Sequence, residues 1–200
     1  DNPALLTHDD VITLINEFGH GLHHLLSLVE EPSVTGISGV PWDAVELPSQ
    51  FLENWCWERG ALDLVTSHVD TGEPLPDKLL QSLRGARNFQ SGMQMVRQLE
   101  FGLFDFRLHA SIAQISADAI QRLLDDVRQQ VAVVIPPPFD RFPHAFTHIF
   151  AGGYAAGYYG YLWSEVLSAD AYNRFEQEGV FNATTGRAFL QHILETGGVE

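Results

Sequence analysis

The chain has 200 residues, of which 45% are hydrophobic, and a formal net charge of −15 from 11 basic and 26 acidic side chains. A chain of this size and composition buries a hydrophobic core of its own, as one domain or two. The acidic excess excludes nucleic acid and anionic membranes as expected partners, because binding to phosphates requires clustered Lys and Arg.

The cysteine content and the hydropathy pattern bear on the compartment. Cys56 is the only cysteine, which excludes an internal disulfide and is typical of a reducing compartment. No apolar run reaches the length of a membrane span, and no basic segment precedes an apolar one at the start of the sequence. We therefore expect a cytoplasmic protein.

The spacing of apolar residues predicts an all-α fold. Apolar side chains recur at intervals of three and four from Val11 onward, and Thr7 and Asp10 are spaced as an N-cap and N3 pair, so a helix is expected from about 8 to 30. The Gly- and Pro-containing stretch "EPSVTGISGVPWD" predicts a loop. A second helix is expected from about 43 to 65, with Pro48 tolerated near its first turn.

Five more helices are expected after the turn-rich connector "SHVDTGEPLPD". Ser116 is placed to cap one of them, because serine side chains accept hydrogen bonds from the first turn of a helix. The Pro-rich segment "IPPPFDRFPHAF" is too short to separate two domains. The expected helices span about 78–83, 88–110, 117–131, 158–177 and 184–194.

The first predicted helix has two different faces. At about 100° per residue, Phe18, Leu22 and Leu25 lie on one side. The opposite side carries polar groups: Thr13, Asn16, Glu17, His20 and either His23 or His24. We predict that the apolar face packs against the core and that the polar face is presented to a ligand or partner.

The string Asn-Glu-Phe-Gly-His, whose Asn, Glu and His lie on the polar face, differs by one residue from a zinc-protease motif. In H-E-x-x-H, two His on adjacent turns bind zinc and the Glu acts as general base on the metal-bound water. Without the first His, the motif alone is weak, because an E-x-x-H pair on a helix is ordinarily solvated.

Three blocks of sequence in order provide a more specific signal: "INEFGHGLHHLL", "GISGVPWDAVELPSQFLENWCWE" and "HIFAGGYAAGYYGYLWSEV". Together they resemble the thimet oligopeptidase and oligopeptidase A family of zinc metallopeptidases, over nearly the whole chain. The resemblance implies an all-α, zincin-like catalytic domain with helices packed around a metal-site helix pair, acting on short peptides in a deep channel. It also implies that residues 1–200 are the catalytic, C-terminal portion of a larger oligopeptidase whose N-terminal helical region is absent.

The resemblance implies a site for one zinc ion. His20 and Glu46 correspond to metal ligands, Glu17 corresponds to the general base, and Asn16 stands at a ligand position where the family has His. For Glu46 the alternative is an acidic residue that only favours the first turn of a helix. One of three residues farther along the next helix could orient His20 through a hydrogen bond: Ser49, Gln50 or Glu53.

The third block implies further catalytic groups. His148, Tyr154 and Tyr161 match positions where the family places donors to the oxyanion and the substrate backbone. Tyr158, Gly152 and Gly153 are expected to contact substrate, since glycines let a peptide pass close to the loop. The alternative is aromatic packing, with at least half of the rings of Tyr158, Tyr159, Tyr161 and Trp163 in the core.

Asn16 leaves three interpretations open. An amide nitrogen does not bind zinc and an amide oxygen is a weak ligand. The substitution is a deliberate inactivation, a natural loss of catalysis, or a change that still allows weak metal binding through His20, Glu46 and water. We expect little or no peptidase activity from residues 1–200, because of Asn16 and of the absent region. The alternatives are an inactive peptide-binding pseudo-peptidase and a purely structural helical domain.

Overall fold

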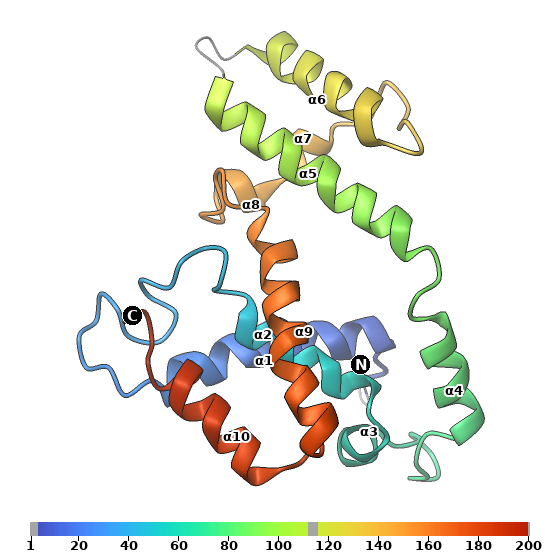
Figure 1. Cartoon of the computed structure of the whole chain (residues 1–200). Helices are drawn as coiled ribbons and strands as arrows, with labels where there is room; N and C mark the ends of the chain where they lie inside the picture. Colours follow the sequence, from blue (N-terminus) through green and yellow to red (C-terminus); the bar gives the residue numbers. More distant parts are fainter. Residues whose placement is uncertain (1–3, 112–115, 200) are drawn as a thin grey trace. The chain divides into compact units, whose positions relative to one another are not determined.

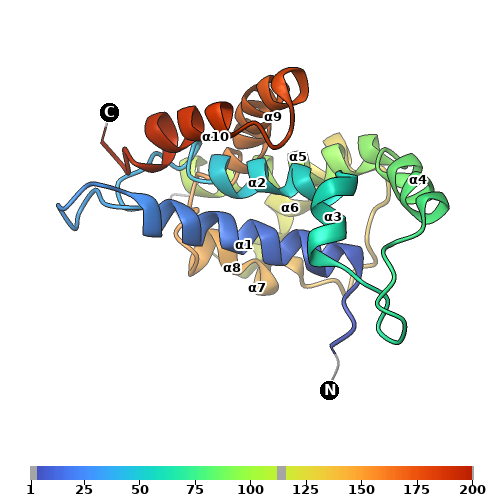
Figure 2. The same ribbon diagram turned by 90° about the horizontal axis from the view of Figure 1, so that it is seen from below.

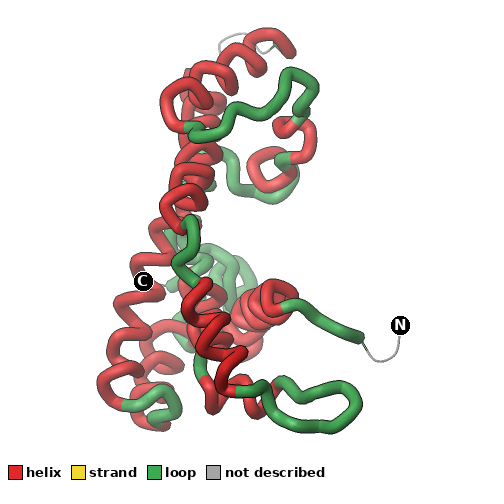
Figure 3. The backbone as a smooth tube through the Cα atoms, turned by 90° about the vertical axis from the view of Figure 1, so that its right-hand side faces the viewer, coloured by secondary structure: helices red, strands yellow, loops and turns green. Residues whose placement is uncertain are grey.

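The computed structural model describes residues 4–111 and 116–199. This part consists of helices and loops and contains no strand (Figure 3), which confirms the predicted all-α fold. None of its helices is long and apolar enough to cross a membrane. The chain divides into two compact units: unit 1 comprises residues 1–87 and 163–200, and unit 2 comprises residues 88–162.

Unit 1 is built from helices near both ends of the sequence. The first segment contributes α1 (His8–Leu26), α2 (Leu47–Glu53), the short 3₁₀ helix η1 (Asn54–Trp57), α3 (Arg59–Val65) and α4 (Asp77–Ala86). The second segment contributes most of α9 (Gly160–Glu178), α10 (Ala183–Phe189) and the π-helical turn η2 (Leu190–Leu194). Helices α1 and α2 lie side by side in this unit (Figures 1 and 2).

Helix α1 begins where the sequence predicts. The Thr7 hydroxyl accepts a hydrogen bond from the Asp10 amide at 3.2 Å, and the Asp10 carboxylate accepts one from the Thr7 amide at 2.8 Å. This reciprocal capping box satisfies two amides that a helix start otherwise leaves unpaired. The helix ends at Leu26, about four residues before the predicted end, because Ser27 leaves the helical conformation and the next amide, of Leu28, donates to Glu195.

The prediction of which α1 face packs was wrong. Phe18 and Leu25, on the predicted packing face, are 53% and 75% exposed, whereas Gly19 and His23 are buried. The reason is Gly19, whose missing side chain lets the backbone of α2 approach the other side of α1. Hydrophobic periodicity does not detect a contact of this kind, because glycine contributes almost no apolar area.

The predicted helix from 43 to 65 was also wrong as a single element. It forms α2, η1 and α3, with a break at Glu58, which is extended at φ −97° and ψ 127°. The two indoles before the break are held by distant partners: Trp55 Nε1 donates to the Val180 carbonyl at 3.0 Å, and the Trp57 ring packs 4.4 Å from that of His8. Tertiary packing therefore overrides the local helical pattern.

The core of unit 1 joins α2 to the C-terminal helices. Phe51, on α2, is 3% exposed and stacks on Phe189 of α10, with ring centroids 4.0 Å apart. Tyr172 and Phe175, both on α9, complete this aromatic cluster. The start of α2 is therefore fixed from both sides, by α1 and by the cluster.

Unit 2 contains the remaining helices: α5 (Ser91–Ser111), α6 (Ala117–Val131), α7 (Phe142–Ala145), α8 (Thr147–Phe150) and the first residues of α9. Helices α5 and α6 pack against each other (Figure 1). Helix α6 has the predicted bounds and cap, since the Ser116 hydroxyl accepts from the Ala119 amide at 3.2 Å. The core of the unit consists of Phe104, Leu108, Leu124, Phe146, Ile149 and Tyr158.

A buried ion-pair network attaches the Pro-rich segment to unit 2. Arg128, on α6, is 4% exposed and binds Glu100 of α5 at 2.9 Å. The same guanidinium donates to Asp140 in the Pro-rich segment at 2.6 Å. The segment is thus part of this unit and does not separate two domains, as the sequence indicates.

Candidate functional site

The closest approach of α1 and α2 occurs at Gly19. A Cβ atom added there would lie 2.5 Å from Ser49 Cα and 2.9 Å from the Pro48 carbonyl oxygen, which is too close for any side chain. Glycine therefore allows the two helix backbones to touch. The contact brings His20, the next residue, to the start of α2.

His20 and Glu46 meet across this contact. The His20 Nε2 atom lies 3.0 Å from Glu46 Oε2, and the Glu46 carboxylate is buried directly before α2. The hydrogen bond to Glu46 raises the pKa of His20. Ser49 donates a hydrogen bond from its hydroxyl to Glu46 Oε2 at 2.8 Å, which fixes the carboxylate. The structure thus brings together the two residues that the sequence indicates as metal ligands.

Asn16 lies one turn before His20 and is also held by α2. Its Nδ2 atom donates to Glu53 Oε1 at 2.6 Å, and burial raises the pKa of Glu53. Of the residues expected to orient His20, Ser49 instead contacts Glu46, and Glu53 instead contacts Asn16. Ser49 and Glu53 thus contact residues next to His20 in the site, and an orienting role toward His20 itself stays a prediction.

The donor set does not fit a zinc centre with three protein ligands. Within the part of the chain that the structure describes, no three His, Cys, Asp or Glu side chains form a group able to hold a metal ion. His20 and Glu46 face each other, Asn16 supplies an amide in place of an imidazole, and Glu17 is exposed. Zinc is bound in proteins by imidazole, thiolate and carboxylate groups, so this chain provides two suitable donors.

A second group of candidate residues lies together within unit 2. Tyr154 stacks on Tyr161 with ring centroids 5.1 Å apart, and Tyr158 lies 5.1 Å from Tyr161. The His148 ring lies 5.8 Å from Tyr158 and 6.1 Å from Tyr161. Burial raises the pKa of Tyr158. We call these four residues the His–Tyr cluster.

The loop before α9 folds back tightly on α8. Gly153 has a positive φ of 86°, and a Cβ atom at Gly152 would lie 2.9 Å from the backbone of His148. Glycine is required at these two positions by backbone conformation and by close approach, respectively. Tyr158 is buried, while Tyr159 and Trp163 are 37% and 57% exposed, so only part of the aromatic sequence is core. Contacts of Tyr158, Gly152 and Gly153 with substrate stay predictions.

The comparison with protein families decides the assignment. The sequence profile described as peptidase family M3 matches residues 1–200. The chain belongs to this family. The family resemblance seen in the three sequence blocks is thereby confirmed, and the relatives named oligopeptidase A confirm the relation to that protein.

Relatives within family M3 share almost the entire chain. Oligopeptidase A of Salmonella typhimurium is 62% identical over 198 residues, 99% of this chain and 29% of that protein. Probable cytosolic oligopeptidase A of Arabidopsis thaliana is 46% identical over 202 residues, again 99% of this chain and 29% of that protein. Dipeptidyl carboxypeptidase of Escherichia coli is 37% identical over 205 residues, which are 99% of this chain and 29% of that protein. The M3 chain thus spans 29% of the length of these relatives.

His23 is a buried residue of the M3 chain whose environment the sequence does not reveal. Its side chain is 2% exposed, and neither ring nitrogen has a hydrogen-bond partner among the described residues. Burial, reinforced by the positive charges that His20 and His24 can carry, lowers the pKa of His23. The sequence placed His23 or His24 on a face open to a ligand, and only His24 is exposed.

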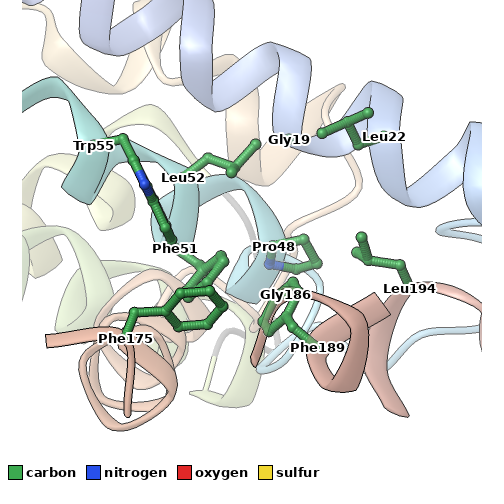
Figure 4. A pocket seen from close by; sticks show the side chains of 10 residues that line it. All are labelled: Gly19, Leu22, Pro48, Phe51, Leu52, Trp55, Phe175, Gly186, Phe189 and Leu194. Carbon is green, nitrogen blue, oxygen red and sulfur yellow. The ribbon is translucent and has the colours of Figure 1, made fainter. Parts of the chain in front are cut away.

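An apolar pocket of about 210 Å³ lies in unit 1 beside the α1–α2 contact. Figure 4 shows its lining, which includes the rings of Phe51, Phe175 and Phe189. The sequence does not reveal this pocket, because its residues come from both ends of the chain. The lining residues are Gly19, Leu22, Pro48, Phe51, Leu52, Trp55, Phe175, Gly186, Phe189 and Leu194.

Proposed function

We propose that this M3 chain is the catalytic portion of an oligopeptidase that hydrolyses short peptides, and that Asn16 leaves its metal centre incomplete. The observation that carries the proposal is the pairing of His20 Nε2 with Glu46 Oε2 at 3.0 Å across the α1–α2 contact. Membership of a peptidase family and the names of the relatives, which are peptidases, support the reaction class.

The metal dependence in this proposal concerns zinc. His20 and Glu46 are the proposed ligands, and residue 16 is the third ligand position when it is His. Loss of one of three protein ligands lowers zinc affinity by orders of magnitude, because an amide is a poor substitute for imidazole. Glu17 follows residue 16 on α1 and is exposed, and it stays the proposed general base.

The His–Tyr cluster is the proposed source of donors for the peptide. Acyl transfer at a peptide bond requires hydrogen-bond donors aimed at the oxygen that becomes negative in the transition state. The imidazole of His148 and the hydroxyls of Tyr154 and Tyr161 are groups of this kind, and their rings lie close together. Tyr158 and the neighbouring Gly152 and Gly153 are proposed to contact the substrate backbone.

Regions outside residues 1–200 are proposed to complete the peptide channel. The chain spans 29% of the length of its relatives, and α1 leaves large apolar side chains exposed. Leu14, Phe18 and Leu25 are 58%, 53% and 75% exposed. An apolar row on one helix face is normally covered by another element, so this row is where we expect the remaining protein to pack.

A cytoplasmic location stays part of the proposal. It is supported by the single cysteine and by an Arabidopsis thaliana relative whose name includes the word cytosolic. We do not expect nucleic acid to be a partner, since the net charge of −15 opposes binding to phosphates.

A second candidate function is peptide binding without hydrolysis. It is favoured by the hydrogen bond between Asn16 and Glu53, because the Asn16 amide then contacts a carboxylate of the protein instead of a metal. In such a pseudo-peptidase the His–Tyr cluster retains its role in binding, and zinc has no effect on peptide affinity.

Zinc content per chain tests the proposal, measured after dialysis for the parent protein and for Asn16→His. We expect about one zinc per chain in the variant and almost none in the parent. Asn173→His is the matched control, because it introduces an imidazole at an exposed position on another helix of unit 1. If Asn16→His holds no more zinc than Asn173→His, the ligand assignment is wrong.

Peptide affinity and hydrolysis then separate the two functions. Calorimetric titration of the parent with a short peptide, with and without zinc, detects binding that does not depend on metal. The pseudo-peptidase is supported if the parent binds peptides and zinc-loaded Asn16→His, in a protein that includes the regions outside residues 1–200, binds them equally but never cleaves them. Cleavage by zinc-loaded Asn16→His supports the oligopeptidase.

A further inference from the structure

Asp105 is a fully buried carboxylate on α5, within unit 2. A buried charge is tolerated only when hydrogen bonds or opposite charges replace its hydration. Its two oxygens accept hydrogen bonds from the backbone amides of Ala156 at 2.8 Å and Tyr158 at 3.0 Å. The Asp105 Oδ1 atom also lies 2.8 Å from Nδ1 of His109, one turn later on the same helix. The carboxylate thus ties α5 to the loop before α9.

The loop needs such an anchor, because its backbone is strained where Asp105 binds it. Ala156 has a positive φ of 56°, in the left-handed region that residues with a side chain rarely adopt. A conformation of this kind persists only where surrounding contacts enforce it. The amide of Ala156 is one of the two groups that Asp105 holds.

The anchored loop carries two rings of the His–Tyr cluster, and it leads directly into α9, whose first turn carries a third. Tyr154 precedes Ala156 by two residues, Tyr158 follows it by two, and Tyr161 lies in the first turn of α9. The stacking of Tyr154 on Tyr161 therefore depends on the path of the backbone between them, and this path passes over Asp105.

We propose that Asp105 is a positioning residue, whose carboxylate holds residues 154–161 in the path that assembles the His–Tyr cluster. The effect on structure is independent of any activity. Its consequence for catalysis rests on the proposed peptidase function, in which the cluster supplies donors to the substrate. Asp105 itself does not contact the reacting groups in this proposal.

Amide hydrogen exchange at Ala156 and Tyr158, followed by NMR, tests the hydrogen bonds directly. In the parent protein both amides are expected to be protected. Asp105→Asn keeps the side-chain shape but replaces one acceptor oxygen by an NH₂ group. Because hydrogen bonds to charged groups are strong, we expect exchange at one or both amides to accelerate roughly 10- to 100-fold. Exchange within α6 should change by less than about threefold.

His109→Gln is the matched control. It removes the imidazole beside the carboxylate and leaves both backbone hydrogen bonds in place. The amides of Ala156 and Tyr158 should keep parent-like protection. If Asp105→Asn does not fold, the measurement on the parent protein still tests the proposal. Exchange of both parent amides at the rate of an unstructured peptide would overturn the proposal.

Fluorine NMR of protein labelled with 3-fluorotyrosine reads out the rings themselves. Four of the five tyrosines lie at positions 154–161, and the fifth, Tyr172, lies in unit 1 and serves as an internal reference. Asp105→Asn should shift or broaden the resonances of Tyr154, Tyr158 and Tyr161 and leave that of Tyr172 unchanged. Unchanged resonances from all five tyrosines overturn the proposal.

Experiments on the Asn16→His variant separate the positioning role of Asp105 from the proposed peptidase function. If zinc-loaded Asn16→His cleaves peptides, adding Asp105→Asn should lower kcat at least about tenfold with unchanged zinc content, since misplaced donors stabilise the transition state less. Unchanged kcat despite displaced rings overturns the catalytic consequence of positioning. If the rings move but zinc-loaded Asn16→His does not cleave peptides even in a protein that includes the regions outside residues 1–200, the proposed function fails and the positioning role stands.

Discussion

Asn16 and Glu53 join α1 to α2 through a hydrogen bond of 2.6 Å from the amide to the carboxylate. The bond lies one helical turn from His20, whose own partner, Glu46, lies seven residues before Glu53. Ring nitrogens of metal-bound histidines commonly donate their second N–H to a carboxylate, which fixes the ring and raises its basicity. Glu53 is therefore placed to support an imidazole at position 16.

Replacement of Glu53 by Gln in the Asn16→His background should weaken zinc binding. We expect a loss of about 10- to 100-fold in affinity, because outer carboxylates of metal sites typically contribute this much. Competition with a chromogenic chelator measures the affinity without reference to activity. Glu165→Gln is the control, since Glu165 acts on Glu53 only through its charge. Equal affinities in Asn16→His with and without Glu53→Gln would rule out this supporting role.

Gly19→Ala should separate α1 from α2. The new methyl group would lie 2.5 Å from Ser49 Cα, and the backbone atoms of Pro48 and Ser49 leave it no space. Overpacking of this kind costs about 1–3 kcal/mol of unfolding free energy. All four tryptophans belong to unit 1, so urea unfolding followed by tryptophan fluorescence reports on the unit that contains the substitution.

Gly21→Ala provides the comparison for Gly19→Ala, because a Cβ atom at position 21 meets nothing within 4 Å. Alanine is the better helix former, so this change should leave unit 1 as stable or stabilise it by about 0.4–1 kcal/mol. A Gly19→Ala protein as stable as Gly21→Ala would show that the helices do not touch at this point.

Local sequence signals predicted the ends of helices better than their packing. The capping residues Thr7 and Ser116 act within one turn of their own helix, so their pattern in the sequence was sufficient. The break at Glu58 depends on Trp55 and its bond to Val180, which lies more than a hundred residues away in the chain. Contacts over such distances leave no periodic signal.

The candidate site was predictable where it follows the family pattern. His20 and Glu46 were indicated as a pair by that pattern and lie in contact. The partner of Asn16 was not predictable, because three polar residues on α2 were equally placed to reach α1, and only the helix packing selects Glu53. Asp105 was missed entirely, since an acidic residue in a helix is normally exposed.

Cys56 should be unreactive in the folded protein. Its side chain is 3% exposed, and burial, with a smaller effect from Glu53, raises the pKa of the thiol to about 11. Because the thiolate is the nucleophile, labelling by a thiol reagent at about pH 8 should be at least ~100-fold slower than in urea. Stopped-flow absorbance measures both rates. Equal rates with and without urea would contradict the buried position.

The buried imidazole of His23 should make unit 1 less stable in acid. Its pKa is lowered from the ordinary value of 6.5, so the folded state favours the neutral ring. The resulting stability is fully present above pH 6.5 and is lost as the pH falls through the lowered pKa. His20, whose pKa is raised, has the opposite dependence: its contribution is present below pH 6.5 and is lost as the pH rises.

Comparison with His23→Gln isolates the contribution of His23, because glutamine does not titrate while His20 is present in both proteins. Urea unfolding followed by tryptophan fluorescence, from about pH 7.5 down to about pH 5, gives the free energy of each. The free energy of unfolding of the parent should decrease relative to that of His23→Gln as the pH falls. His24→Gln, at an exposed position on the same helix, removes only the smallest cause of the lowered pKa and should retain most of the acid sensitivity of the parent. A difference between parent and His23→Gln that stays constant over this range would mean that His23 does not resist protonation in the folded state.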